Sequence, residues 1–259
     1  MKITYKSFKH IIAKKCYRLA IMLDNSSNCK FASNGERRFI EKLFEDLKYK
    51  NDIVLFDVGG NIGDYTEMLQ HCVHNITEKF DIHLFEPTEK CFDELSSRFD
   101  DERIHLNQFA CSDENGHTYI YYDQKGSTLA SLHQRNQIGT GSKLKFTESI
   151  ETVRLDDYIK QHNIQHIDFM KIDVEGHEAS VLEGMGKYLD PSFVDLIQFE
   201  YGGANLDSMK TLMYFYGLFE SKGFVISKIL PNSLHVRKYD TFSENFEYGN
   251  YVAISKRLL

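Results

Sequence analysis

Short apolar runs alternate with helix-like segments between residues 52 and 110, and this alternation allows few folds. The run "DIVLFDVG" is nearly all apolar, as expected for a strand that is buried on both faces. Two further strands, "FDIHLFE" and "RIHLNQFA", follow, separated by "NIGDYTEMLQHC" and "TEKCFDELSSRF", which carry apolar residues at helical spacing. The order β-α-β-α-β predicts a parallel sheet with helices on both faces.

The alternation stops over residues 114–154 and then resumes. The interruption holds two strand-like pieces, "HTYIYY" and "SIETVR", around a Gly/Ser/Gln-rich middle, and we interpret it as an insertion. Strands are predicted at 167–173 and 193–201, each followed by a helix. The last two strands, 223–230 and 247–255, have no helix between them and are expected to pair antiparallel. The prediction is an α/β fold with seven strands, five of them parallel and the last two forming a hairpin at one edge.

Residues 1–50 lie outside this pattern and are expected to form a helical extension to a domain over residues 51–259. Residues 8–23 place Phe8, Ile11, Ile12, Cys16, Leu19 and Leu23 at helical spacing, with lysines between them. A second helix is predicted within residues 33–50. Two roles remain open for the first helix: packing against the domain or a second subunit, or attachment to an anionic membrane. A homo-oligomer is likewise left open.

The charge is unevenly distributed along the chain. Residues 1–23 carry six basic residues and no acid, so the remainder is −13 within a total of −7. An acidic body argues against extended contact with nucleic-acid phosphates. The five cysteines are odd in number and lack CxxC spacing, which fits reduced thiols in a cytoplasmic protein. The run "LAIML" is too short for a signal-peptide core or a membrane span.

The loop "FDVGGNIG" follows the first predicted strand and has two candidate ligands. A dinucleotide fingerprint, G-x-G-x-x-G, needs its second glycine where this chain has Asn61. The alternative is D-x-G-x-x-x-G, read as Asp57, Gly59 and Gly63, the loop of S-adenosylmethionine (SAM) enzymes. Glu86 ends the second strand, where a carboxylate can accept hydrogen bonds from both hydroxyls of an adenosine ribose. NAD and SAM share that ribose, so Glu86 supports an adenosine ligand without selecting one.

A second cluster of ionisable residues lies at and after the fourth predicted strand, in "MKIDVEGHEASVLEGM". Lys171, Asp173, Glu175, His177 and Glu178 fall within eight residues. Ligands in open α/β sheets bind at the carboxyl ends of the strands, so this cluster is expected beside the glycine loop. The alternative is a solvated helix start, in which Glu175 or Glu178 complements the helix dipole.

These motifs together resemble the FkbM-type SAM-dependent methyltransferases. The resemblance rests on "FDVGGNIGDYT", "LFEP", "ACSDENG", "VRLDDYI", "IDFMKIDVEGHEASVLEGM" and "IQFEY" in this order, and it covers about residues 52–201. Most family members have alanine where this chain has Gly60. The resemblance implies a class I SAM-methyltransferase (Rossmann-like) fold. It also implies O-methylation, mostly of sugars in glycans or of hydroxyls of secondary metabolites.

The resemblance also implies roles for individual residues. The loop at the methionine end of SAM is expected to comprise Asp57, Gly59, Gly60, Asn61, Gly63 and Thr66. Around the ribose and adenine it implies Glu86, Pro87, Ala110, Cys111 and Asp113. Asp173 and Glu175 are expected nearest the transferring methyl group. A sugar hydroxyl needs a base as it attacks, and the candidates are His177 or Glu175, with Asp173 and Glu200 as alternatives.

The insertion is expected to shape the acceptor pocket, although a mobile surface loop is the other reading. The candidate acceptor-binding residues are Ser127, Ser131, His133, Arg135 and Tyr201. The carboxylates could also hold Mg²⁺, but their spacing shows no diagnostic metal pattern, so no resident metal is predicted.

Three other functions agree less well with the residues. Nucleic-acid methyltransferases that act on exocyclic amines carry a [D/N/S]-P-P-[Y/F/W] motif where this chain reads Asp173-Val174-Glu175-Gly176. The intact Asp57, Glu86 and Asp173 argue against a non-catalytic binding protein. Asn61 argues against a nicotinamide oxidoreductase.

Overall fold

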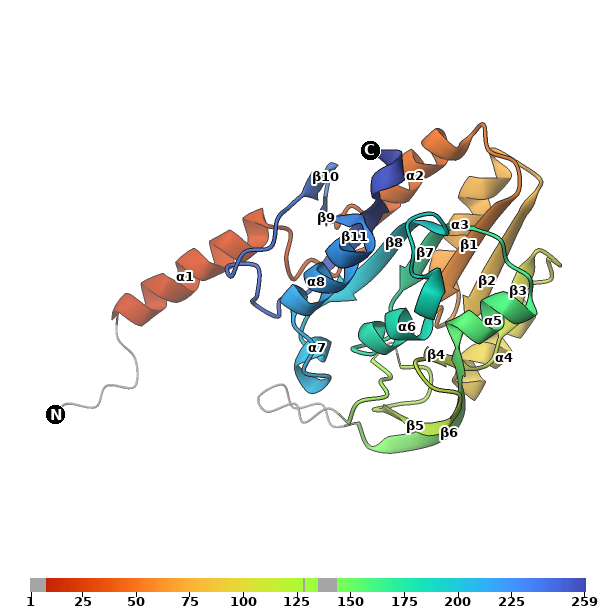
Figure 1. The fold of residues 1–259 in the computed structure, drawn as a ribbon. Coiled ribbons are helices and arrows are strands. Elements are labelled where there is room, and N and C mark those ends of the chain that lie inside the picture. The colour runs from red at the N-terminus through yellow and green to blue at the C-terminus, as the bar shows by residue number, and fades with distance from the viewer. Residues whose placement is uncertain (1–7, 128, 135–143) are drawn as a thin grey trace.

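A central sheet of eight strands organises the fold (Figure 1), and the computed structural model describes residues 8–127, 129–134 and 144–259. The strand order is β10-β9-β11-β8-β7-β1-β2-β3. The strands are β1 (Ile53–Val58), β2 (Phe80–Phe85), β3 (Ile104–Asn107), β7 (Ile167–Ile172), β8 (Val194–Tyr201), β9 (Phe224–Leu230), β10 (Ser233–Val236) and β11 (Gly249–Ser255). β11 runs antiparallel to both of its neighbours, and β10 runs antiparallel to β9. The other six strands therefore share one direction.

All seven predicted strands form, but the hairpin at the sheet edge differs from the prediction. The last two predicted strands, β9 and β11, do pair antiparallel. β11, however, inserts between β8 and β9, so it pairs along both of its sides. The edge position belongs to β10, an exposed four-residue strand that the sequence pattern did not indicate. β11 is buried along its whole length, which fits the apolar run "YVAI" at its centre.

The third predicted strand, 103–110, is broken in the structure. β3 ends at Asn107, whose side-chain amide donates to the Leu84 carbonyl at 3.1 Å and to the His105 carbonyl at 2.9 Å. A side chain that bonds to nearby backbone competes with continued strand pairing. The next residues, Ala110–Ser112, form β4 of a separate sheet in the order β4-β6-β5. Its other strands, β5 (Gly116–Tyr122) and β6 (Phe146–Arg154), are the two strand-like pieces of the insertion.

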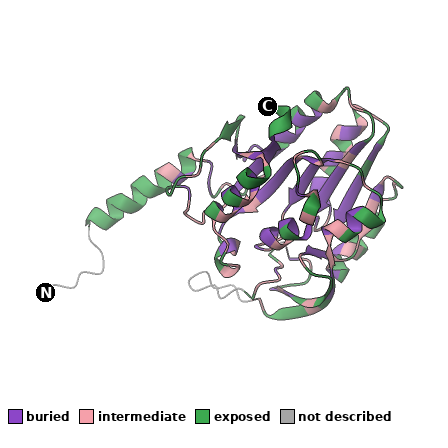
Figure 2. Cartoon of the chain, viewed as in Figure 1, coloured by how far each residue is buried: buried purple, intermediate pink, exposed green. Residues whose placement is uncertain are grey.

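Helices cover both faces of the central sheet, as the alternation predicts. The helices are α1 (Phe8–Leu23), α2 (Glu36–Leu47), α3 (Asp64–His74), α4 (Glu89–Arg98), α5 (Leu155–Gln161), α6 (Glu178–Gly184), α7 (Ala204–Asp207) and α8 (Leu212–Lys222), with short 3-10 turns at Gly186–Tyr188 and Lys256–Leu258. One apolar cluster joins α2 and α3 to the sheet, and a second joins α5, α6 and α8 to it. The strands between these layers are the most buried part of the molecule (Figure 2). In β1, for example, Leu55 belongs to the first cluster and Phe56 to the second.

The two N-terminal helices behave differently. The apolar face of α2 packs into the first cluster through Phe39, Ile40, Leu43 and Phe44. α1 instead extends away from the body beyond the β9–β10 side of the sheet, and it is exposed along most of its length (Figures 1 and 2). In the part of the chain that the structure describes, no helix combines the length and apolar character that a membrane span requires.

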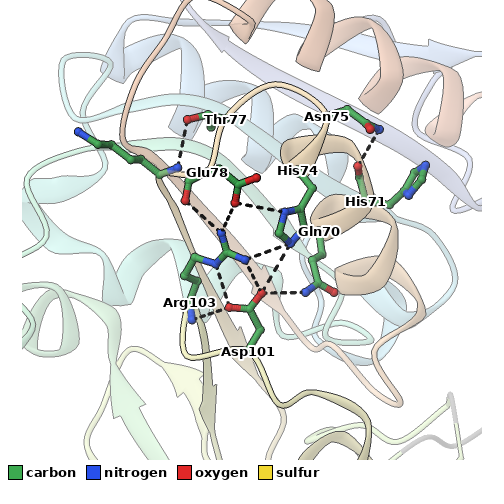
Figure 3. Close-up of polar contacts among 9 residues, drawn as sticks. Gln70, His71, His74, Asn75, Thr77, Glu78, Asp101 and Arg103 are labelled. Carbon is green, nitrogen blue, oxygen red and sulfur yellow. Dashed lines mark hydrogen bonds and ion pairs between the residues drawn. The ribbon is translucent and has the colours of Figure 1, made fainter.

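A cluster of charged side chains lies at the amino ends of β2 and β3 (Figure 3). The Arg103 guanidinium binds Asp101 through Nε and Nη2, both at 2.9 Å, and Glu78 through Nη1 at 2.9 Å. It also lies 4.4 Å from the centroid of the Phe80 ring. Hydrogen bonds from Arg103 hold the pKa of Asp101 below its ordinary value. The cluster connects the loop after α3 to the start of β3, at the end of the sheet opposite the candidate site.

Candidate active site

The carboxyl ends of β1, β2 and β7 open onto a cavity with about 780 Å³ of empty space. That space includes the open solvent at the mouth of the cavity. Of the sequence-predicted residues, the cavity is lined by Gly59, Asn61, Glu86, Pro87, Ala110, Cys111, Ser127, Asp173, Glu175 and His177. The alternation of strands and helices therefore brings both predicted clusters to one edge of the sheet.

The glycines of the loop after β1 face protein atoms. A Cβ on Gly59 would lie 1.9 Å from the carbonyl oxygen of Asp173, and Gly59 has φ +88°. Its N–H and that of Gly60 both donate to the Phe85 carbonyl, at 2.9 and 3.1 Å. The missing side chain at Gly59 thus lets the ends of β1, β2 and β7 approach each other.

Gly60 and Gly63 do not line the cavity. A Cβ on Gly60 would lie 2.7 Å from Cγ of Leu84. An alanine at this position would therefore require Leu84 to move. Gly63 has φ +89° and precedes the first residue of α3.

Asp57 lies behind the cavity wall and is almost fully buried. Its Oδ2 accepts a hydrogen bond from the Thr66 hydroxyl at 2.6 Å, which fixes the carboxylate against α3. Burial raises the pKa of Asp57, opposed by the positive charge of Lys171 and by the Thr66 hydrogen bond. Neither Asp57 nor Thr66 lines the cavity, so the structure places both in support of the loop.

Glu86 follows β2 and contacts the glycine loop directly. Its Oε2 accepts a hydrogen bond from the Asn61 N–H at 3.1 Å, and its Oε1 accepts one from the Thr88 N–H at 2.9 Å. Asn61 has φ +47°, a left-handed conformation that asparagine tolerates better than most residues. Burial raises the pKa of Glu86 although these hydrogen bonds lower it. The carboxylate is therefore held in one orientation at the cavity wall.

The far wall of the cavity is apolar and comes largely from residues that the sequence analysis did not single out. These are Phe85, Phe109, Ile120, Ala130 and Leu132. Ile120 lies in β5, and Ala130 and Leu132 follow it within the insertion. The sequence does contain a signal for Ile120. Successive side chains of a strand lie on opposite faces, and this alternation in "HTYIYY" places Ile120 on the buried face of the small sheet.

The insertion is attached to the site by hydrogen bonds from Ser131 and Asn61. The Ser131 hydroxyl donates to the Glu175 carbonyl at 2.7 Å, and the Asn61 side-chain amide donates to the Ser127 carbonyl at 3.4 Å. Ser131 is almost fully buried and also pairs with Tyr121 of β5 through its backbone. Glu175 has φ +52°, so the contact from Ser131 supports a backbone conformation that non-glycine residues rarely adopt.

Three carboxylates converge at the ends of β7 and β8. Single oxygens of Asp173, Glu175 and Glu200 all lie within 4.8 Å of one another. Nζ of Lys171 lies 2.6 Å from Oδ2 of Asp173 and 4.4 Å from the centroid of the Tyr65 ring. Burial disfavours the charged form of Lys171, but the surrounding carboxylates, Asp173 first, raise its pKa above the ordinary value.

The ionisation of Glu200 is strongly perturbed. Burial, followed by the charges of Asp173 and Glu175, raises the pKa of Glu200 well above its ordinary value. Lys171 and a hydrogen bond from Tyr248 act in the opposite direction. Asn250 Nδ2 donates to the Tyr248 hydroxyl at 2.9 Å. Glu200 does not line the cavity. It lies beside Asp173 and Glu175, which do line it.

His177 lines the cavity directly before α6. Its Nε2 lies 2.9 Å from the Ser112 hydroxyl, and its Nδ1 is buried without a hydrogen-bond partner in the described part of the structure. Its ring centroid is 5.6 Å from that of His133. Burial, and then the charge of His133, lower the pKa of His177 to about 4. The imidazole is therefore neutral at neutral pH.

The remaining predicted residues lie away from the cavity wall. Tyr201 is fully buried, packs against Phe246 and contacts Glu244 through its hydroxyl. Asp113 accepts a hydrogen bond from Ser112 at 3.1 Å and does not line the cavity. His133 does not line the cavity, but its ring centroid lies 5.6 Å from that of His177 and its backbone N–H donates to the Ser131 hydroxyl at 3.1 Å. Arg135 lies outside the described residues.

The fold and the site together define a class of protein. β11 lies antiparallel between β8 and β9, and an acidic residue lies at the carboxyl end of each of β1, β2, β7 and β8. This arrangement is expected of a class I SAM-dependent methyltransferase. The Methyltransferase FkbM domain matches residues 57–238, well over half of the chain. The chain belongs to the FkbM methyltransferase family, and this family membership implies SAM as the cofactor.

The chain is similar to several individual methyltransferases. The chain is 25% identical over 210 residues to "Methyltransferase 1" of Beauveria bassiana, covering 75% of this chain and 81% of the relative. It is 26% identical to the hexuronic acid methyltransferase AglP of Haloferax volcanii, covering 69% and 68%. It is 28% identical to the 31-O-demethyl-FK506 methyltransferase FkbM of Streptomyces tacrolimicus, covering 64% and 75%. The crystal structure of a methyltransferase FkbM from Methylobacillus flagellatus KT is 16% identical with a TM-score of 0.48, covering 78% of this chain and 43% of that one.

Proposed function

We propose that the protein transfers a methyl group from SAM to a hydroxyl of a sugar or a related polyhydroxylated molecule. The observation that carries this proposal is the convergence of Asp173, Glu175 and Glu200 beside the cavity. Relatives named for hexuronic acid methylation, for 31-O-demethyl-FK506 and for 2-O-methylation support a hydroxylated acceptor.

The residues around the cavity fit the chemical groups of SAM. Glu86 is oriented by its hydrogen bonds to Asn61 and Thr88, and its remaining acceptor sites suit vicinal ribose hydroxyls. The apolar wall around Phe109 and Ile120 suits an adenine ring. The acidic cluster favours a ligand that carries positive charge at its methionine end. SAM, when bound, supplies an electrophilic methyl group on a sulfonium centre.

We assign the proton-accepting role to the carboxylate cluster in preference to His177. A general base works best when its pKa is near the working pH. Burial, and then the neighbouring carboxylates, raise the pKa of Glu200, whereas the pKa of His177 is lowered to about 4, so the imidazole is the weaker base. Asp173 and Glu175 line the cavity and are placed to receive the hydroxyl, with Glu200 behind them sharing the proton.

No resident metal is required by this proposal. The three carboxylate oxygens are close enough together to hold a cation, but the ammonium group of Lys171 already lies 2.6 Å from Asp173. The Lys171 ammonium group therefore supplies the positive charge that a divalent ion would otherwise bring to the carboxylates. The acidic body of the chain and its cysteine content suit a small-molecule or glycan acceptor in the cytoplasm.

A screen of acceptors with isotope-labelled SAM tests the proposal. Monosaccharides, uronic acids, their glycosides and polyhydroxylated macrolides would be incubated with the full chain, and products would be detected by mass spectrometry. We expect a labelled methyl ether on a hydroxylated acceptor, in equal yield with and without EDTA. Methylation of a nucleic acid or a protein amine alone would contradict the proposed acceptor class, and loss of activity in EDTA would contradict the metal-free assignment.

A further inference from the structure

α1 presents an apolar surface that the rest of the protein does not cover. Phe8 is 77% exposed, Leu19 52% and Leu23 75%. Among the sixteen residues of the helix, Ile21 is the buried one. Monomeric proteins seldom leave a row of large apolar side chains in solvent without a partner.

Four of the exposed apolar side chains form a row on the side of α1 that faces away from the body, while Ile11, Tyr17 and Met22 are exposed elsewhere around the helix. At about 100° per residue, Phe8, Ile12, Leu19 and Leu23 fall within about 60° of one another around the helix axis. The contacts with the body lie roughly opposite, where Tyr17 donates a hydrogen bond to Glu247 at 3.2 Å and where Ile21 is buried. We call this outward row of four residues the apolar row of α1.

The base of α1 is firmly attached. Nζ of Lys228, itself almost fully buried, lies 2.6 Å from Oδ2 of Asp24, the residue directly after the helix. Nδ2 of Asn25 donates to the carbonyl of Ile229 at 3.1 Å, and the N–H of Ser27 donates to the carbonyl of Tyr248 at 2.7 Å. The helix is thus a fixed projection of about 24 Å rather than a loose tail.

Basic side chains flank the apolar row. Lys9 and Lys15 fall on its two borders, and Lys14 and Arg18 lie further around the helix. None of these four takes part in an ion pair among the described residues, and the helix contains no acid. Lysines at the border of an apolar face can bury their stems while their ammonium groups reach polar headgroups.

We propose that α1 docks the protein on an anionic lipid surface, with the apolar row inserted at the interface and the bordering Lys9 and Lys15 on the headgroups. An uncovered apolar row with a basic surround matches the two features of such a surface, its hydrocarbon and its negative charge. Two copies of α1 packed along this row would bring lysines together with no acid to pair with them, which disfavours a seam between α1 helices.

Vesicle co-sedimentation of the full chain tests the proposal. The vesicles would be phosphatidylcholine alone, or phosphatidylcholine with roughly one third phosphatidylglycerol. We expect binding to the anionic vesicles and at least about tenfold weaker partitioning to the neutral ones. Ile12→Glu/Leu19→Glu, in the apolar row, and Lys9→Glu/Lys15→Glu, at its two borders, should each lower partitioning at least about tenfold.

Matched substitutions elsewhere separate this docking from general charge or hydrophobicity. Tyr49→Glu removes another highly exposed apolar side chain, and Lys160→Glu/Lys222→Glu removes the same charge at the ends of α5 and α8. These controls should stay within about twofold of the wild type. All substituted side chains are exposed, so folding should be unaffected, as circular dichroism would verify. Absence of binding to anionic vesicles, equal loss in the controls, or a dimer in solution that only the Ile12/Leu19 variant dissociates would overturn the proposal.

Discussion

The Glu36 carboxylate at the start of α2 accepts a hydrogen bond from Nε2 of Gln198, in the middle of β8, at 2.7 Å. Gln198 is fully buried, and its Oε1 accepts a hydrogen bond from the Tyr65 hydroxyl at 2.8 Å. Glu36 lies before residue 57, where the match to the family begins. A residue outside the family region thus satisfies a buried amide next to the carboxylate cluster.

Removal of this contact should destabilise the fold. Glu36→Ala leaves the Asn34 side chain without this acceptor and the Gln198 amide with only its longer bond to Asn250 Oδ1 at 3.3 Å, and a buried group left unsatisfied costs about 1–3 kcal/mol. We expect urea denaturation to show a free energy of unfolding lower by about 2 kcal/mol. Glu41→Ala, on an exposed position of the same helix, should change it by less than about 0.5 kcal/mol. Equal effects of the two substitutions would show that the contact is unimportant.

Loss of the Ser131 hydroxyl should affect activity more than stability. Ser131→Ala removes the hydrogen bond to the Glu175 carbonyl, which holds a left-handed residue beside the carboxylate cluster. We expect a stability loss of about 1 kcal/mol and a fall in kcat of roughly tenfold, since small misplacements of catalytic groups are costly. Ser149→Ala, at an exposed position of β6, is the matched control and should leave kcat unchanged. An unaltered kcat in Ser131→Ala would remove this positioning role.

The assignment of the base predicts opposite outcomes for two substitutions. Glu200→Gln preserves shape but cannot take a proton, so kcat should fall about a hundredfold or more. His177→Asn should lower kcat by less than about tenfold, because the pKa of His177 is lowered to about 4 and Nε2 already contacts Ser112. Steady-state kinetics, with SAM affinity measured in parallel, distinguishes them. A larger loss in His177→Asn would make the imidazole the base.

Glu178 should make stability depend on pH. It is almost fully buried, and burial raises its pKa to about 7, although it accepts hydrogen bonds from the Gly176 N–H at 3.0 Å and from Asn205 at 3.1 Å. Because the folded-state pKa lies above the unfolded value of 4.5, the stabilisation is fully present below that value and is lost as pH rises through about 7.

The pH dependence can be isolated with Glu178→Gln. The loss attributable to Glu178 between the two pKa values is about 3 kcal/mol. Chemical denaturation between pH 4.5 and 8 should therefore show a decline that is smaller by about 3 kcal/mol in the variant, in which Asp57, Glu86 and Glu200 with their raised pKa values still contribute. The exposed Glu114→Gln should retain the decline. A decline of the same size in all three proteins would assign it to other groups.

Much of the site could be predicted from the sequence because its residues sit where apolar runs end. Asp57, Glu86, Asp173 and Glu200 each end or follow a strand, and a parallel sheet must bring such positions to one edge. The apolar content of those runs made the strands recognisable without any partner. The bounds of helix α1 could also be predicted, because they follow from the local spacing of its apolar residues alone.

What could not be predicted depends on contacts between distant segments. The role of Gly59 follows from the Asp173 carbonyl, which the fold brings to where a Cβ would be. The bond from Gln198 to Glu36 joins residues 162 positions apart. β4 exists only because Ala110–Ser112 pairs with β6, and no local pattern separates it from the preceding strand. The apolar cavity wall likewise requires the insertion to fold over the sheet edge.

Calorimetric titration of SAM into the wild type and Glu86→Gln tests the central claim most directly. Glu86 lines the cavity in a fixed orientation, and a hydrogen bond to a charged group contributes about 1.5–3 kcal/mol. The account predicts one SAM bound per chain, with affinity at least about tenfold weaker in Glu86→Gln. Glu89→Gln, an exposed neighbour, should bind SAM as the wild type does. No heat of binding in the wild type, or equal affinity in the wild type and Glu86→Gln, would contradict it.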